Sequence, residues 1–308
     1  MKSMNDLRLH LGLFLIGLAG LVTLPFINVE STSGQSVANR GRVKRTAAVR
    51  TKRPEATGDN SAPALNFAAS RNTLLRTELN WIFGGKQQKG WYLYQPLIKK
   101  LLETNKDAGT EAFAAALSKW QEKSGLASTG VLDEESLYAM VSRWQGARLK
   151  ERTVATPEQL VTAPASDFYD PTRPEELRQV QRDTYLAYKR MISAAISDKS
   201  SGLAIDGEGK LASSEKYLKI VSAFRSGEYQ EQLRRQSPSA GRAGLAINSP
   251  HFTGRALDLY VGGQPVETKD SNRAIQIQTR VYQWLVGNAE RFGFRPYYYE
   301  PWHWEYVR

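Results

Sequence analysis

The chain has 308 residues, of which 41% are hydrophobic and 10% aromatic. This suffices for a targeting segment and two packed domains, and it excludes a chain that is disordered throughout. Cysteine is absent, which excludes disulfide frameworks, thiolate zinc sites and cysteine nucleophiles. The formal net charge is +11, but seven basic residues with no acid between them cluster in residues 40–53. Much of the excess positive charge therefore belongs to one tail-like segment and not to a binding face. We expect no nucleic-acid partner.

Residues 1–28 are predicted to be a signal anchor or a signal peptide. Lys2 and Arg8 precede an apolar run over residues 11–27, LGLFLIGLAGLVTLPFI. Positive charge before such a run predicts export of the chain that comes after it. The run has no clear A-x-A cleavage site behind it, so an uncleaved anchor is favoured over a removed signal. We expect an extracytoplasmic protein, at the periplasm or the cell-wall face, anchored to the membrane.

Residues 29–65 read as a flexible basic linker, because they are rich in Ser, Thr, Arg, Gly and Ala and lack apolar periodicity. Their charge suits contact with an anionic wall polymer or lipid. A solvated linker without such contact is the simpler alternative.

Residues 66–148 are expected to form a small all-helical domain. In the stretch EAFAAALSKWQEKSG, Phe113, Leu117 and Trp120 have helical spacing, and Gly125 ends the helix. Asp133 can cap a second helix. That helix would carry Leu137, Met140 and Val141 on one face.

The pattern F-x-x-x-L-x-x-W-Q-x-x-x-G-L-x-x-T-G-V-L-D-x-x-S-L, from Phe113 onward, resembles the second half of the peptidoglycan-binding domain found in many wall hydrolases. The resemblance implies a module that targets the enzyme to its substrate. A three-helix spacer that binds nothing is the alternative.

Residues 149–174 are rich in Pro, Thr and Ala and are expected to be a second linker, which places the domain boundary there. The last domain, residues 175–308, should begin with a helix at about Glu175 and continue into short strands and loops.

Two of the three histidines lie beside carboxylates in this last domain. His251 lies in a loop marked by Pro250 and Gly254, ahead of an alternating strand that contains Asp258. His303 comes after Glu300 in the stretch EPWHWEYV. A loop imidazole and a strand carboxylate can converge on one point.

Two imidazoles and one carboxylate are a common ligand set for catalytic zinc, with an open position for water. We therefore predict His251, Asp258 and His303 as ligands of one zinc ion and Glu300 as the general base. The alternative is a pair of ordinary core histidines. The helical H-E-x-x-H pattern of other zinc peptidases is absent.

The run S-x-H-x-x-G-x-A-x-D from Ser249 to Asp258, with E-P-W-H from Glu300 later in the chain, resembles the signature of VanY-type D-alanyl-D-alanine carboxypeptidases, zinc peptidases of the LAS superfamily. The block S-x-x-R-S-x-x-x-Q, with Arg225 and Gln230, is also similar. The resemblance implies an α+β domain with a central antiparallel sheet. It further implies zinc-dependent hydrolysis of D-amino-acid peptide bonds in peptidoglycan stem peptides.

The resemblance also implies roles for residues beside the metal. Arg225 would anchor the substrate or stabilise negative charge in the transition state. Gln230 falls at a matching position and is assigned to substrate binding. Ser249 would bond the substrate or hold the loop, and the loop role is slightly favoured.

Two alternatives to a carboxypeptidase stay open. Only RPYYY separates the Phe294 region from Glu300, where VanY-type members commonly carry a longer loop, so the pocket wall is undefined. An endopeptidase or dipeptidase is therefore also compatible with the sequence. A non-catalytic wall-binding module of the same fold is the other alternative, although it would not need Glu300.

Overall fold

The computed structural model describes residues 61–83, 85–236 and 248–308. The predicted targeting segment and nearly all of the first basic linker lie outside these residues. The described residues belong to one compact unit. Within the described residues, no helix is both long and apolar enough to cross a membrane.

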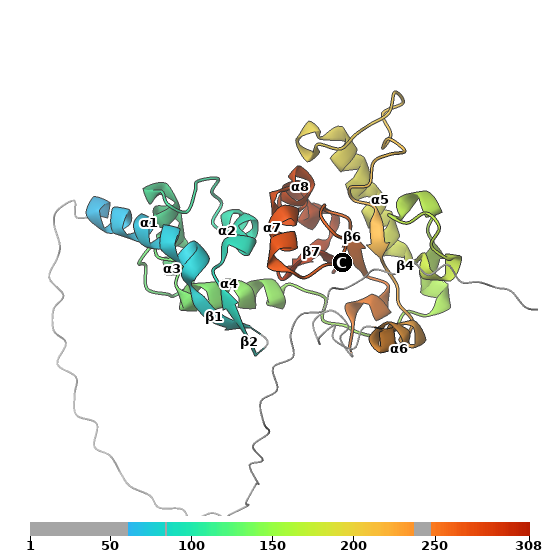
Figure 1. The fold of residues 1–308 in the computed structure, drawn as a ribbon, viewed down its shortest axis with the longest axis horizontal. Coiled ribbons are helices and arrows are strands. Elements are labelled where there is room, and N and C mark those ends of the chain that lie inside the picture. Colours follow the sequence, from blue (N-terminus) through green and yellow to red (C-terminus); the bar gives the residue numbers. More distant parts are fainter. Residues whose placement is uncertain (1–60, 84, 237–247) are drawn as a thin grey trace, which may run out of the picture. The chain divides into compact units, whose positions relative to one another are not determined.

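Helices and strands alternate irregularly along the chain, as expected for an α+β protein (Figure 1). The α-helices are α1 (Ser61–Glu78), α2 (Gln95–Leu101), α3 (Glu111–Lys123), α4 (Glu134–Gly146), α5 (Arg182–Ser197), α6 (Gly227–Gln236), α7 (Asp270–Gln278) and α8 (Arg280–Asn288). The strands are β1 (Asn80–Phe83), β2 (Lys86–Lys89), β3 (Leu160–Thr162), β4 (Gln179–Gln181), β5 (Ile220–Ser222), β6 (Ala256–Leu259), β7 (Phe294–Tyr297) and β8 (Glu300–Tyr306). Short 3-10 turns are η1 (Tyr92–Tyr94), η2 (Pro157–Gln159), η3 (Ala165–Asp167), η4 (Glu175–Leu177), η5 (Lys199–Ser201), η6 (Pro250–Thr253) and η7 (Ala289–Phe292).

The two helices predicted in residues 66–148 are confirmed. Together with α1, which begins at Ser61, they belong to the N-terminal helical region, residues 61–148. The Thr110 side chain caps α3 by accepting from the Phe113 N–H, and Asp133 caps α4 by accepting from the Ser136 N–H at 2.9 Å. Gly125, just beyond α3, has φ of +73°, which glycine adopts without strain. The predicted apolar residues are buried on one face of each helix, except that Trp120 is only partly buried.

The expectation that this region is all helical is wrong at residues 80–89. Strands β1 and β2 form an antiparallel hairpin in which Phe83 pairs with Lys86. Trp81 fixes the hairpin, because its ring is buried and its Nε1–H donates to the Gly90 carbonyl at 2.9 Å. The Gly-Gly pair between the two strands is a typical hairpin signal.

The segment 149–174, expected as a linker, is packed into the fold. Its strand β3 pairs with β4, and Phe168, which is buried, forms a bridge with Ile220 of the central sheet. The Ala155 N–H also donates to the Phe252 carbonyl at 2.8 Å, beside His251. Burial of apolar side chains stabilises the folded state in a Pro-rich stretch as it does elsewhere. A composition rich in Pro, Thr and Ala therefore does not by itself identify a linker.

The helix expected from Glu175 begins instead at Arg182. Residues 179–181 pair with β3, and the Gln181 side chain then caps α5 by accepting from the Thr184 N–H at 2.8 Å. The strand pairing with β3 therefore keeps residues 179–181 out of the helix, although their composition favours one.

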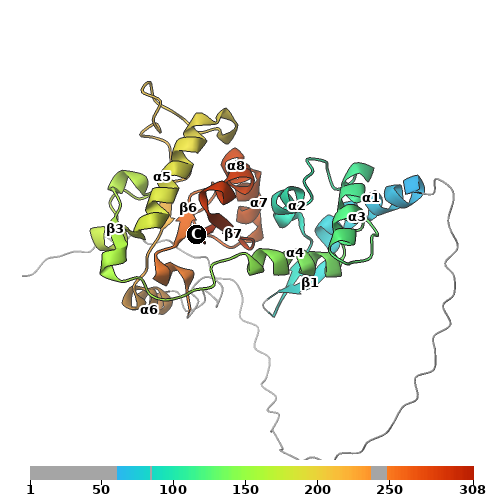
Figure 2. The same ribbon diagram turned by 180° about the vertical axis from the view of Figure 1, so that it is seen from behind.

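The central sheet is antiparallel, as predicted, with strand order β5-β6-β8-β7. Both views place α7 and α8 beside this sheet (Figures 1 and 2). Ser222, Asp258 and His303 lie side by side on β5, β6 and β8. Because strand side chains alternate, these three share one face, while Leu257 and Trp304 point to the opposite one. The sheet thus separates a polar row from the apolar core.

Candidate metal centre

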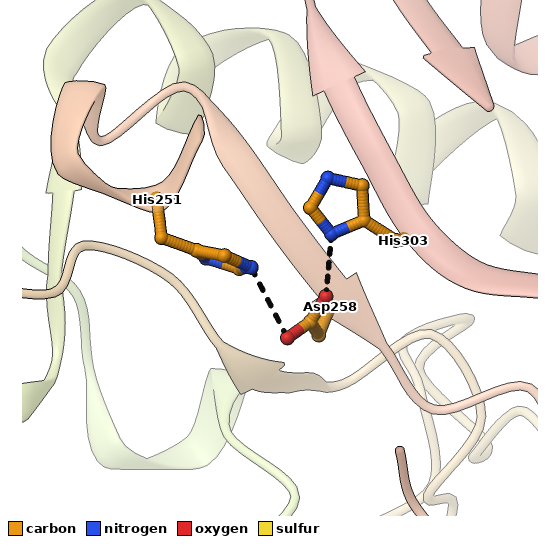
Figure 3. Close-up of side chains that lie close together, drawn as sticks. All are labelled: His251, Asp258 and His303. Atoms are coloured by element: carbon orange, nitrogen blue, oxygen red, sulfur yellow. Dashed lines mark hydrogen bonds and ion pairs between the residues drawn. The ribbon is translucent and has the colours of Figure 1, made fainter. Parts of the chain in front are cut away.

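The three predicted zinc ligands lie together. His251 comes from η6, Asp258 from β6 and His303 from β8, and one potential ligand atom from each lies within 4.8 Å of the other two. Figure 3 shows both imidazoles directed at the two oxygens of Asp258. His251 Nε2 is 3.3 Å from Asp258 Oδ2, and His303 Nδ1 is 2.9 Å from Asp258 Oδ1. All three side chains are almost completely buried.

The tautomer of His251 is determined by its backbone partner. Its Nδ1 lies 2.7 Å from the Ala223 carbonyl oxygen, which can only accept, so Nδ1 carries the hydrogen. The lone pair is then on Nε2, which faces Asp258. Burial, together with the nearby Arg225, lowers the pKa of His251 from 6.5 to about 4. The ring is therefore neutral at physiological pH, as a metal ligand must be.

His303 is held between two carboxylates. Besides Asp258 at Nδ1, its Nε2 lies 3.2 Å from Oε1 of Glu305. Burial alone would lower the pKa of His303, but the hydrogen bonds to both carboxylates raise it from 6.5 to about 9. Without a metal the ring is thus an imidazolium, and a cation would replace the proton at Nδ1.

Asp258 is also paired with the predicted substrate residue Arg225. The Arg225 Nη2 donates to Asp258 Oδ2 at 2.8 Å, and its Nε donates to Ser222 Oγ at 2.9 Å. Burial opposes ionisation of Asp258, but the two histidines hold its pKa well below the usual value. The position of Arg225 is therefore set by the metal centre, while its contact with substrate stays a prediction.

Glu300, the predicted general base, is buried at the start of β8 with 7% of its surface exposed. Among the described residues, no group forms a hydrogen bond with its Oε1. Burial raises the pKa of Glu300 from 4.5 to about 7, which suits a group that must both take and release a proton. The β7–β8 register is irregular next to Tyr297 and Glu300, a feature common beside active sites.

The two remaining predicted residues have different settings. Ser249 caps η6, its Oγ accepting from the His251 N–H at 3.3 Å, which supports the role in holding the loop. Gln230 is buried on α6, and its role in substrate binding stays a prediction.

Three residues that contact the ligands are not predicted from the sequence. Ala223 contributes only its carbonyl, which leaves no signal in the sequence. Tyr297 places its ring edge-on to His303, with centroids 6.0 Å apart. Glu305 has no exposed surface, and its position two residues after His303 in an aromatic strand is a usable signal, since such strands rarely bury an unpaired acid.

Residues 210–308 match the family model described as VanY, D-alanyl-D-alanine carboxypeptidase. This part of the chain is VanY-like. The match confirms the resemblance drawn from the sequence, and it contains every predicted site residue. The comparison with curated proteins gives no match.

Among solved structures, this chain is similar to one described as the LdcB LD-carboxypeptidase, in a study of the molecular basis of peptidoglycan recognition. The identity is 25%, over 50% of this chain and 70% of that chain, and the TM-score is 0.35. At this TM-score the likeness is too weak to define the fold.

The residues present fit a zinc ion. Two imidazoles and one ionised carboxylate are a typical catalytic set, and each imidazole is fixed by a second hydrogen bond, as metal-binding histidines usually are. One donor atom from each residue lies within 4.8 Å of the other two, so a single ion could be held by all three side chains.

Proposed function

We propose that this protein hydrolyses D-amino-acid-containing peptide bonds in peptidoglycan stem peptides with the help of zinc, and that it acts as a D-alanyl-D-alanine carboxypeptidase. The observation that carries the proposal is the buried Glu300, whose Oε1 has no hydrogen-bond partner among the described residues and whose ionisation is influenced by the charges of Asp258 and His303 of the three-donor cluster. A protein that only binds metal does not need such a carboxylate as a base. The VanY match over residues 210–308 supports the substrate class.

Each residue at the site has a proposed part in the reaction. A zinc ion at His251, Asp258 and His303 would polarise the scissile carbonyl and acidify a water molecule. Glu300 Oε1 accepts the proton of the attacking water and then delivers it to the leaving amine nitrogen. Arg225, fixed by Ser222 and Asp258, provides positive charge at the edge of the site for the substrate carboxylate or the developing oxyanion.

We further propose that the protein works outside the cytoplasm and that residues 66–148 bring it to the wall. The apolar run over residues 11–27 supports the first part, and the peptidoglycan-binding-like pattern supports the second. The basic linker is proposed to contact anionic polymer or lipid.

Incubation with muropeptides of defined stem length, combined with mass analysis of the products, tests the function. Zinc-loaded protein should remove one C-terminal D-alanine from a pentapeptide stem. Chelation should abolish the reaction, and addition of zinc should restore it. Release of a larger fragment would indicate an endopeptidase. Intact stems in the presence of zinc-loaded protein would contradict the proposal.

A further inference from the structure

Glu305 is a fully buried carboxylate on the same face of β8 as His303. Burying a charge costs free energy unless partners compensate it, and Glu305 has several. Its Oε2 accepts from the Leu149 N–H at 2.9 Å. Its Oε1 accepts from Arg148 Nε at 3.2 Å and forms an ion pair with the same guanidinium. Burial opposes ionisation of Glu305, but His303 and Arg148 hold its pKa well below the usual value.

The contact between Glu305 and His303 leaves the opposite ring nitrogen, Nδ1, facing the metal centre. Both ring nitrogens face carboxylates, Nδ1 facing Asp258 Oδ1 at 2.9 Å and Nε2 facing Glu305 Oε1 at 3.2 Å. If a cation takes the place of the Nδ1 hydrogen, the remaining ring hydrogen lies on Nε2 and is donated to Glu305. The lone pair is then on Nδ1, the atom that faces Asp258. Glu305 thus engages Nε2 and fixes the orientation of the ring.

Apart from His303, the partners of Glu305 described above come from outside the VanY-like residues. Arg148 and Leu149 lie just after helix α4 of the N-terminal helical region. Arg148 also lies over the Tyr297 ring, 4.0 Å from its centroid, and that ring meets His303 edge-on. The end of the helical region therefore reaches His303 by two routes, one through Glu305 and one through Tyr297.

We propose that Glu305 is a positioning residue for the metal ligand His303, and that Arg148 and the Leu149 backbone hold it in place. The proposal rests on the metal site of the proposed function. It makes the end of the helical region part of the metal centre, so that docking of this region raises the affinity for zinc. A purely structural ion pair would stabilise the fold without changing zinc binding.

Zinc affinity of the full chain, measured by competition with a chelator, separates these two roles. Loss of a carboxylate that orients a ligating histidine typically weakens metal binding about 10–100-fold, and we expect a loss of this size for Glu305→Ala. Arg148→Met should give a smaller loss in the same direction, and Arg148→Lys, which restores the charge, should fall between Arg148→Met and wild type. Excess zinc should recover much of the turnover of Glu305→Ala.

Tyr94→Phe is the matched control. The Tyr94 hydroxyl accepts from Arg273 Nη2 at 3.0 Å, which joins the same helical region to α7 without touching a metal ligand. This variant should lower thermal stability but keep the zinc affinity of wild type.

Zinc affinities of Glu305→Ala and Arg148→Met within about twofold of wild type would overturn the proposal. If Glu305→Ala does not fold, as judged by circular dichroism, the zinc affinities of Arg148→Met and Arg148→Lys decide between the positioning role and the purely structural role. A wild-type protein that binds zinc but leaves every stem peptide intact would overturn the proposed function only. A wild-type protein that binds no zinc would overturn both.

Discussion

Asp258 and His303 lie directly opposite each other on β6 and β8, with Oδ1 and Nδ1 2.9 Å apart. Side chains alternate along a strand, so a shift of one residue in this pairing would turn one of the two away from the site. Trp304, buried on the opposite face, stabilises the register. The pair of ligands is therefore fixed by the packing of the sheet, and only His251 depends on a loop.

We expect the purified protein to bind about one equivalent of zinc, because three convergent donors leave one open coordination position. His251→Ala removes the loop donor and should lower the zinc content well below one equivalent after dialysis. Metal analysis by mass spectrometry checks this. His10→Ala, which changes a histidine outside the described residues, is the control and should keep full zinc content. Stoichiometric zinc in His251→Ala would remove this residue from the ligand set.

Stability of the metal-free protein should depend on the ionisation of Glu300. Burial raises the pKa of Glu300 from 4.5 to about 7, so the folded state binds this proton more tightly than the unfolded state. The stabilisation of the folded state by this tighter proton binding is complete below pH 4.5 and is lost as the pH rises through about 7. The loss is of the order of 3 kcal/mol, because each pKa unit corresponds to about 1.4 kcal/mol.

The Glu300→Gln variant has no ionisable group at this position, so its stability should not fall in this way as the pH rises. Urea unfolding of the chelator-treated wild type and variant between about pH 5 and pH 8 measures the effect. The difference in the free energy of unfolding should move in favour of the variant as the pH rises. Parallel curves over this range would show that Glu300 is not held at a raised pKa.

The wall-binding role of the helical region can be tested on its exposed apolar side chains. Phe67 and Leu74 are 65% and 49% exposed, and their spacing places them on one face of α1. We expect Phe67→Ser/Leu74→Ser to reduce co-sedimentation with insoluble peptidoglycan and to leave hydrolysis of a soluble peptide unchanged, because binding to the wall raises only the local substrate concentration.

Ile275→Ser, at a position on α7 that is 56% exposed, is the matched control for that double variant. It should co-sediment like wild type. Unchanged binding of the α1 variant would remove this face from wall recognition and favour the spacer. Point variants are preferable to deletion of residues 66–145, because Tyr94 in that range bonds Arg273 of the remaining fold.

The sequence predicts best what local chemistry determines. Asp133 is recognisable as a helix cap from its residue type and position, and the structure confirms the contact. The proximity of His251, Asp258 and His303 is predictable because the family pattern carries the spacing of all three.

Features that depend on distant partners could not be predicted in the same way. The pairing of β3 with β4 depends on the burial of residues around Phe168, which composition does not reveal. The role of Glu305 depends on Arg148, which lies far away in the sequence. The hairpin at β1 and β2 is different, since its Gly-Gly pair is a signal visible in the sequence.

Turnover of Glu300→Gln, measured together with its zinc content, tests the catalytic account most directly. The substitution keeps the shape of the side chain and removes its ability to accept a proton, so zinc and substrate binding should be kept. General base catalysis typically contributes about 10²–10⁴-fold, and we predict a fall in kcat of at least this size with one zinc still bound. Hydrolysis of stem peptides by the zinc-loaded variant at the wild-type rate would contradict the account.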